Sequence, residues 1–246
     1  MRARQVLAPL AALLAGLLAT PAARGDQVIA QLTRDSPIAA YGGAVAWSAY
    51  DAHARRFQLV IDQGGQAALA PIPAALGAFD VSLGPDAAGH VVALYTRCRA
   101  AGTGCDVYRY DLRTHREAKV VAVSSPTQNE ALAAQWGDQV AFVRRARAYA
   151  IRAPGSSYNL VPDPRGRRRG DQLVECDAVY VKSLSSPAPS RRLDRGECAP
   201  ATGLSIRGRS IVEVTDIEAG GAGSESQVRQ LSPAGGLARV IARTGG

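Results

Sequence analysis

The chain has 246 residues, of which 47% are hydrophobic and 20% are charged. This is the composition of a folded globular protein, and it excludes a disordered chain. The formal net charge is +8, but all except two of the 29 basic residues are arginine. With the many alanines and glycines, this bias is typical of a GC-rich bacterial genome, so the charge alone does not indicate a polyanionic partner. Aromatic residues make up only 5% of the chain, and they do not alternate with basic ones, so we expect no nucleic-acid binding.

The N-terminal segment has the order of a secretory signal peptide. Arg2 and Arg4 precede an uncharged run from Val6 to Thr20, and small residues follow it. Sites of the small-x-small type lie after Ala22 and after Gly25. We expect a signal peptide over residues 1–25 and a mature domain over residues 26–246.

The rest of the chain has no apolar run of transmembrane length. No cysteine lies near the cleavage region, so we do not expect a lipid anchor. We therefore expect a secreted or periplasmic protein without stable membrane insertion.

Four segments of the mature chain share a glycine turn followed by an apolar strand. With the first glycines aligned, a β-branched residue stands three positions later in each. The second and third glycines follow at intervals of 47 and 48 residues, and the fourth follows after 71, as expected for a repeat with one insertion. The four segments are Gly42 to Trp47, Gly89 to Leu94, Gly137 to Phe142 and Gly208 to Glu213.

Short strands before and after each glycine turn complete the repeat. The strands predicted before the turns are Ile38 to Tyr41, Phe79 to Leu83, Ala131 to Trp136 and Gly203 to Ile206. Those predicted after the turn strands are Phe57 to Ile61, Val107 to Leu112, Val179 to Leu184 and Val228 to Leu231, with further strands at Lys119 to Val123 and Leu237 to Ala242.

Four strands in about 47 residues are the size of a propeller blade. The chain is therefore predicted to be all-β, an array of four recognisable four-stranded blades. A fifth, degenerate blade in the 71-residue interval, at 148–151 and 158–161, and an incompletely closed array that dimerises are open alternatives. We prefer that an extra leading strand, Gln27 to Thr33, seals the ring.

The second unit resembles a known repeat. Asp80 to Tyr95 contains Pro85-Asp86 and Gly89 before an apolar strand, and Asp106-Val-Tyr and Asp111-Leu follow. This order is similar to the WD40-like repeat of TolB-type β-propellers, whereas the other three units lack the Pro-Asp pair. The resemblance implies a propeller whose blades present loops around a rim.

The four cysteines are an even set, as expected of disulfides in an oxidising compartment. Because each sequential pair brackets a predicted hairpin or turn, we favour Cys98 with Cys105 and Cys176 with Cys198. The alternative of a zinc site lacks C-x-x-C spacing and neighbouring histidines.

The insertion, residues 144–175, combines proline, glycine and clustered arginine, which indicates an exposed segment. It could bind an anionic envelope polymer or an acidic protein, or it could be a solvated loop. The arginines of this possible binding loop are Arg144, Arg145, Arg147, Arg165, Arg167, Arg168 and Arg169.

No catalytic, nucleotide-binding or metal-binding motif is present in the sequence, so we expect no metal or cofactor. The histidines, His53, His90 and His115, are expected in separate turns. The aromatic residues Trp47, Tyr95, Trp136 and Phe142 are expected in the core between blades, with a carbohydrate-stacking platform as the alternative.

These observations favour an exported, non-enzymatic binding scaffold for protein or glycan. The alternative is an extracytoplasmic hydrolase or lyase, which needs at least two titratable groups gathered at the central channel.

Overall fold

The computed structural model describes residues 28–100, 103–152, 158–162, 172–193, 200–219, 223–235 and 239–245. The chain divides into two units, Met1–Gln31 and Leu32–Gly246. The described residues of the first unit have no regular secondary structure, and the following concerns the second. In the described ranges no helix is long and apolar enough to cross a membrane.

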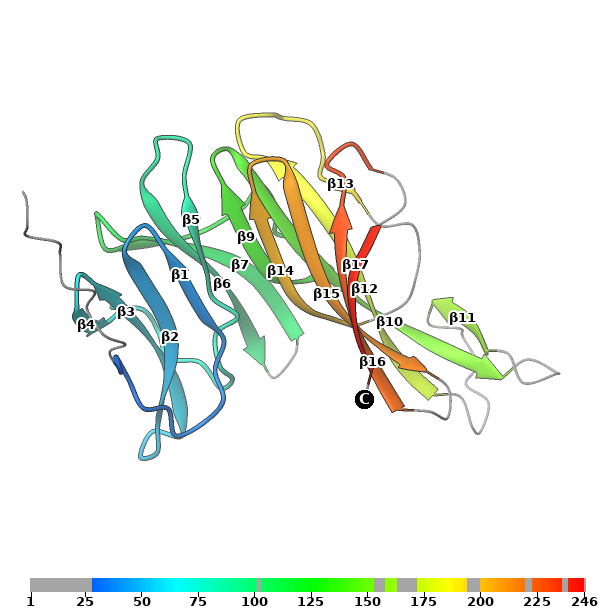
Figure 1. Ribbon diagram of the computed structural model, residues 1–246, viewed down its shortest axis with the longest axis horizontal. Helices are drawn as coiled ribbons and strands as arrows, with labels where there is room; N and C mark the ends of the chain where they lie inside the picture. Colours follow the sequence, from blue (N-terminus) through cyan, green and yellow to red (C-terminus); the bar gives the residue numbers. More distant parts are fainter. Residues whose placement is uncertain are drawn as a thin grey trace, which may run out of the picture. The chain divides into compact units, whose positions relative to one another are not determined.

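The second unit consists of four antiparallel sheets that follow one another along the chain (Figure 1). Each sheet is a blade with its strands in sequence order, and the third carries one additional strand, β11. The first blade comprises β1 (Ile38–Tyr41), β2 (Ala44–Asp51), β3 (Arg56–Gln63) and β4 (Gln66–Leu69), and the second β5 (Ser82–Pro85), β6 (Val91–Ala100), β7 (Thr103–Asp111) and β8 (Arg116–Lys119). The third comprises β9 (Asn129–Trp136), β10 (Gln139–Arg152), β11 (Tyr158–Pro162), β12 (Gln172–Ser183) and β13 (Arg191–Arg192), and the fourth β14 (Ala201–Arg207), β15 (Ser210–Ala219), β16 (Gly223–Leu231) and β17 (Arg239–Gly245). The prediction of four blades is confirmed.

The first strand of each blade packs against the first strand of the next, β1 against β5, β5 against β9, and β9 against β14. These four strands therefore form the inner row of the array. At Gly84 in β5 a Cβ atom would lie 2.1 Å from the carbonyl oxygen of Gln135 in β9. Only glycine allows the two inner strands to approach so closely.

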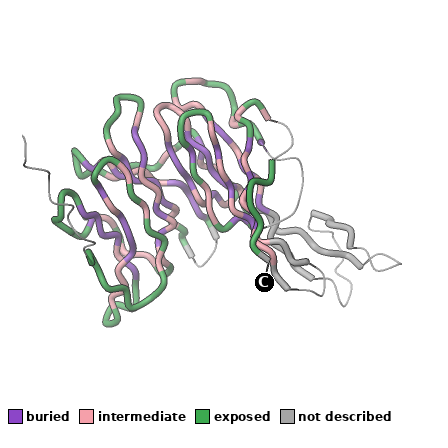
Figure 2. The backbone as a smooth tube through the Cα atoms, in the orientation of Figure 1, coloured by how far each residue is buried: buried purple, intermediate pink, exposed green. Residues whose placement is uncertain are grey.

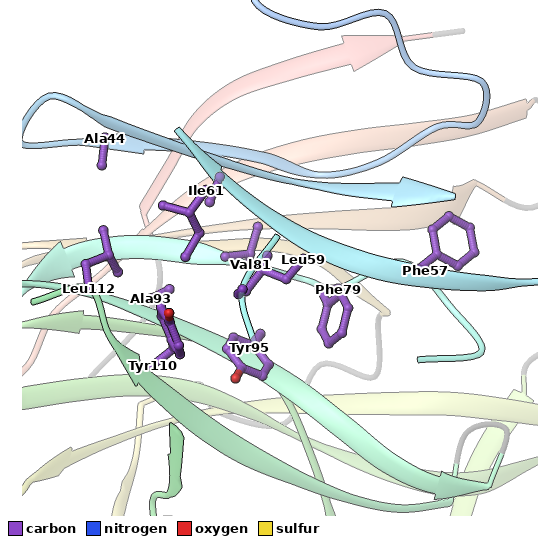
Figure 3. Close-up of a cluster of buried hydrophobic side chains, with 12 residues drawn as sticks. Ala44, Phe57, Leu59, Ile61, Phe79, Val81, Ala93, Tyr95, Tyr110 and Leu112 are labelled. Carbon is purple, nitrogen blue, oxygen red and sulfur yellow. The ribbon is translucent and has the colours of Figure 1, made fainter. Parts of the chain in front are cut away.

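Three hydrophobic clusters fill the spaces between consecutive blades. The largest joins the first and second blades, where Phe79 and Tyr95 meet edge to face with centroids 5.3 Å apart (Figure 3). The others join the second blade to the third and the third to the fourth. Burial follows the strands, whereas most turns are exposed (Figure 2). Successive side chains of a strand point to opposite faces of the sheet. Both faces of a middle blade pack against neighbouring blades, so its strands are buried on both sides.

The glycine turns form as predicted. Gly42, Gly89, Gly137 and Gly208 all have positive φ, between 59° and 84°. However, the second blade is out of phase with the others. Val140 and Ile211 pack against the preceding blade, whereas Val92 packs against the following one. The connection between β5 and β6 comprises residues 86–90, whereas the equivalent turns of the other three blades have two residues. The longer connection shifts β6 so that alternate side chains point to the opposite face of the blade.

Three strand predictions need correction. Residues 28–33 contain no strand, and the outer edge of the fourth blade is instead supplied by β17 from the C-terminal part of the chain. The predicted degenerate blade is not a blade, because residues 148–151 are the far end of β10 and residues 158–161 belong to β11, which pairs with it. The strand predicted at 119–123 lies earlier, at 116–119, because residues 121–123 form a turn.

The Cys98–Cys105 disulfide is confirmed, and the two residues are register partners on β6 and β7. The second predicted disulfide, Cys176 with Cys198, lies outside what the structure describes. Cys198 is not described, and Cys176 is described only as part of β12.

Candidate functional site

The turns between the first two strands of each blade meet at one end of the inner row, which we call the turn end. The amide of Gly137 in the third blade donates to the carbonyl of Pro85 in the second, with N and O 2.9 Å apart. The buried side chain of Gln135 donates to the carbonyl of Gly137 at 2.9 Å and supports the same turn. The residues that precede these turns are thereby held close to one another.

Three of these residues form a cluster, which we call the axial cluster: Tyr41 of the first blade, Trp136 of the third and Arg207 of the fourth. The ring centroids of Tyr41 and Trp136 are 5.5 Å apart with an interplanar angle of 76°. The Cζ atom of Arg207 lies 6.0 Å from the Trp136 centroid. Edge-to-face and cation–π contacts of this geometry are both attractive.

The cluster arises from the repeat itself. Each member is the last residue of the first strand in its blade, directly before a two-residue turn, and pairs with the first residue of the next strand. Tyr41 and Trp136 are half-buried, and Arg207 is exposed. The cluster therefore joins three blades and reaches solvent.

The carboxylates near the turn end are engaged in holding turns. Asp138 accepts hydrogen bonds from the hydroxyls of Ser183 and Ser185 and from the amide of Ser185, and these bonds lower its pKa. Partial burial opposes ionisation of Asp86, but the amides of His90 and Ala88 and the guanidinium of Arg109 outweigh it and lower the pKa. Both side chains are thus ionised and directed to partners within the chain.

A second charged group lies between the second and third blades. Glu130, at the start of β9, is fully buried, and burial raises its pKa to about 7. Its Oε1 atom is 3.4 Å from Nε of Arg144, and its Oε2 accepts from the amide of Ser125 at 3.2 Å. Asp106 also raises the pKa of Glu130, and its own Oδ2 is 2.8 Å from Nζ of Lys119.

This group resembles the acid pair that a hydrolase would require, since two carboxyl groups with different environments are close together. However, Glu130 has no exposed surface, and Asp106 is 8% exposed. In the conformation described here, a substrate would not reach Glu130.

The arginines of the predicted binding loop have different surroundings. Arg144 lies on β10, with its Cζ 4.7 Å from the Tyr180 ring centroid and its Nε near Glu130. The Nε atom of Arg145 lies 3.8 Å from Asp177, and its side chain is 41% exposed. The remaining positions lie outside what the structure describes, Arg147 as to its side chain and Arg165, Arg167, Arg168 and Arg169 altogether.

The four aromatic residues predicted for the core also differ in their surroundings. Tyr95 and Phe142 lie in the clusters between blades, as expected. Trp136 packs against the cluster between the third and fourth blades, as expected, and also contributes to the axial cluster. Trp47 is buried but belongs to none of the three hydrophobic clusters. In the described part of the chain, no three metal-ligating side chains come together, and His90 and His115 contact Asp86 and Tyr110 respectively.

Sequence reasoning missed Tyr41 and Arg207. The signal was present, because both stand directly before an aligned turn glycine, as Trp136 does. Tyr41 and Trp136 also end strands that the repeat predicts, but their side chains gave no sign that they would meet.

The four successive antiparallel blades make the chain a β-propeller in fold. It is similar to several solved structures. TolB from Acinetobacter baumannii is 12% identical, with a TM-score of 0.49 over 85% of this chain and 44% of that chain. The β-propeller domain of the Trilobed protease from Pyrococcus furiosus, described as having an open velcro topology, is 7% identical, with a TM-score of 0.39 over 86% of this chain and 83% of that one.

AtxE2 isopeptidase is 9% identical, with a TM-score of 0.32 over 86% of this chain and 44% of that chain. At such identities the likeness concerns the fold alone, and this propeller spans less than half the length of TolB. No protein family matches the sequence, and no curated protein matches it.

Proposed function

We propose that this propeller is an exported, non-enzymatic binding scaffold whose ligand contacts the axial cluster. The observation that carries the proposal is the convergence of Tyr41, Trp136 and Arg207 from three different blades on one solvent-accessible point. Aromatic rings and arginine are the side chains that contribute most to binding energy at interfaces. The strands of three blades hold the backbone of these residues in place, which lowers the ordering cost on binding.

Two features support export from the cytoplasm. The Cys98–Cys105 disulfide is typical of proteins in an oxidising compartment. The N-terminal sequence has the order of a signal peptide, and its removal after Ala22 or Gly25 would leave the described blades intact. Both features support a secreted or periplasmic location. The partner we propose there is a protein or an anionic envelope polymer.

The test uses the mature chain, residues 26–246, immobilised and exposed to the protein and polysaccharide fractions of a bacterial envelope. A variant with Trp136→Leu and Arg207→Gln should retain about tenfold less material than the wild type, as expected for the loss of one charged hydrogen-bonding group. Arg34→Gln is the matched control, since Arg34 is also an exposed arginine stacked on a ring, with its Cζ 3.9 Å from the Tyr50 centroid.

Equal retention by the wild type and the Trp136→Leu/Arg207→Gln variant would contradict the proposal. A further variant, with Arg165, Arg167, Arg168 and Arg169 replaced by glutamine, tests the insertion. If that variant alone lost binding, the ligand would contact the insertion and not the axial cluster.

A further inference from the structure

Arginines stacked on aromatic rings recur in this chain, and two of them are completed by a carboxylate. Arg97 lies over the ring of Tyr108, with Cζ 4.5 Å from the centroid, and its Nη1 is 2.6 Å from Oε2 of Glu117. Arg144 lies over Tyr180 at 4.7 Å, and its Nε is 3.4 Å from Oε1 of Glu130. In both, the ring holds one face of the guanidinium while a carboxylate approaches its N–H groups. This is the arrangement that a planar guanidinium favours.

Arg207 has the ring but no such carboxylate. It lies over Trp136, and among the described residues no acidic side chain forms an ion pair with it. Arg209, in the same turn, is also exposed and also forms no ion pair with a described residue. The nearby carboxylates of Asp86 and Asp138 are committed to their turns.

We propose that the axial cluster binds an acidic polysaccharide, a polymer of hexuronate type, and that a sugar carboxylate takes the place that Glu117 and Glu130 fill in the other two stacks. The inference rests on the proposed function and names the ligand class of the same site. Arg207 pairs with the carboxylate, and Arg209 adds a second positive charge. The C–H face of the sugar ring packs against the exposed part of Tyr41 and Trp136, as apolar C–H groups do on aromatic rings.

The site favours a saccharide over an acidic peptide. An extended peptide binds most readily by adding to an open strand edge. The first strands are edge strands of their blades, each paired on one side only. However, Tyr41, Trp136 and Arg207 are the last residues of these strands, so no length of strand edge continues past the cluster. The axial cluster therefore offers rings and guanidinium groups, which suit a pyranose ring with a charged substituent.

The experiment measures binding of oligogalacturonate to the mature chain by calorimetry at fixed ionic strength. Maltooligosaccharide of equal length is the neutral comparison, and poly-glutamate is the peptide comparison. We expect oligogalacturonate to bind and both comparisons to bind at least about tenfold more weakly, since each lacks either the carboxylate or the sugar ring.

The variants locate the site. Arg207→Gln should weaken oligogalacturonate binding about tenfold, and Arg207→Lys should restore part of it, because lysine keeps the charge but not the planar, stacked guanidinium. Trp136→Leu should weaken binding as well, because the ring that positions Arg207 is removed. Arg34→Gln should change affinity less than about twofold, as usual for a surface charge away from the ligand. Unchanged melting temperatures verify that each variant is folded.

Three results would overturn the proposal: no binding of oligogalacturonate, equal binding of poly-glutamate, or equal losses in Arg207→Gln and Arg34→Gln. The first two leave the proposed function standing if envelope retention still depends on Trp136 and Arg207. If that retention is independent of both residues, the proposed function itself fails.

Discussion

Two equivalent strand positions, one in the third blade and one in the fourth, carry opposite chemistry. Phe142 and Glu213 each lie five residues after the turn glycine of their blade, and each faces the preceding blade. Their register partners are Tyr180 and Arg229. The first pair is a stack of rings with centroids 5.7 Å apart, and the second is an ion pair with Arg229 Nη2 3.0 Å from Glu213 Oε2.

Register, and not residue type, decides which two side chains meet on the face of each blade. Phe142 is fully buried, Glu213 is 2% exposed and Arg229 is 4% exposed, so both positions are equally removed from water. An aromatic pair gains free energy by burial and by ring contact, with no charge to desolvate. A buried ion pair must first overcome the desolvation of two charges, and it depends on both partners being present. The two interfaces should therefore respond differently to substitution.

The largest effect is expected from Arg229→Met, which removes the guanidinium that lies 3.0 Å from the buried Glu213 carboxylate. We expect the free energy of unfolding to fall by about 4 kcal/mol. Adding Glu213→Leu should recover most of this loss, because a matched apolar pair replaces the ion pair. Urea unfolding of Arg229→Met, Glu213→Leu and the double variant measures the coupling. If the double substitution cost as much as Arg229→Met alone, the ion pair would not be the coupled unit described here.

A second effect, between the second and third blades, depends on pH. The pKa of Glu130 is raised by burial to about 7 in the folded chain, against 4.5 for the ordinary side chain. The folded state thus binds the proton more tightly than the unfolded state. The stability that this proton binding by Glu130 contributes is complete below about pH 4.5 and is lost as the pH rises toward 7. Glu130→Gln should remove this dependence and gain about 3 kcal/mol over the wild type between pH 5 and pH 8.

The control for that measurement is Asp138→Asn, whose effect on the pH dependence of stability should have the opposite sign. Hydrogen bonds from Ser183 and Ser185 lower the pKa of Asp138, so its contribution is present above the ordinary carboxyl pKa and is lost as the pH falls. Thermal melting from about pH 2 to pH 8 compares both variants with the wild type. A Glu130→Gln profile parallel to that of the wild type would show that Glu130 does not titrate in this range.

Much of the fold could be predicted because the turns carry local information. Turn glycines marked all four blades, and each has positive φ in the structure. The short apolar segment before the first of them predicted a strand at Ile38–Tyr41, where β1 lies. The error at residues 28–33 had a physical cause, since the apolar residues Val28, Ile29 and Leu32 suggested a strand. They are exposed, and a strand also needs a partner edge, which local sequence does not reveal.

The candidate site was less predictable, because it depends on contacts between residues far apart in the sequence. Tyr41, Trp136 and Arg207 meet only because the inner strands of three blades lie together. The inward position of Arg144 was equally hidden. Its place in a cluster of arginines in the sequence suggested a solvated loop. In the structure its Cζ lies over Tyr180 and its Nε faces Glu130. Composition shows neither the partner nor the direction of a side chain.

The smallest of the expected effects tests the aromatic half of the comparison. Phe142→Leu keeps an apolar residue of similar volume but removes the stack on Tyr180 and the ring 5.2 Å from Arg144 Cζ. We expect the free energy of unfolding to fall by about 1.5 kcal/mol, a part of it from the lost ring contacts. In the background of Arg144→Met the same substitution should cost less, because the cation–π contact is already absent. Urea unfolding of the four chains gives this coupling. Identical costs in both backgrounds would show that Phe142 stabilises the interface by burial alone and that the contact with Arg144 contributes nothing.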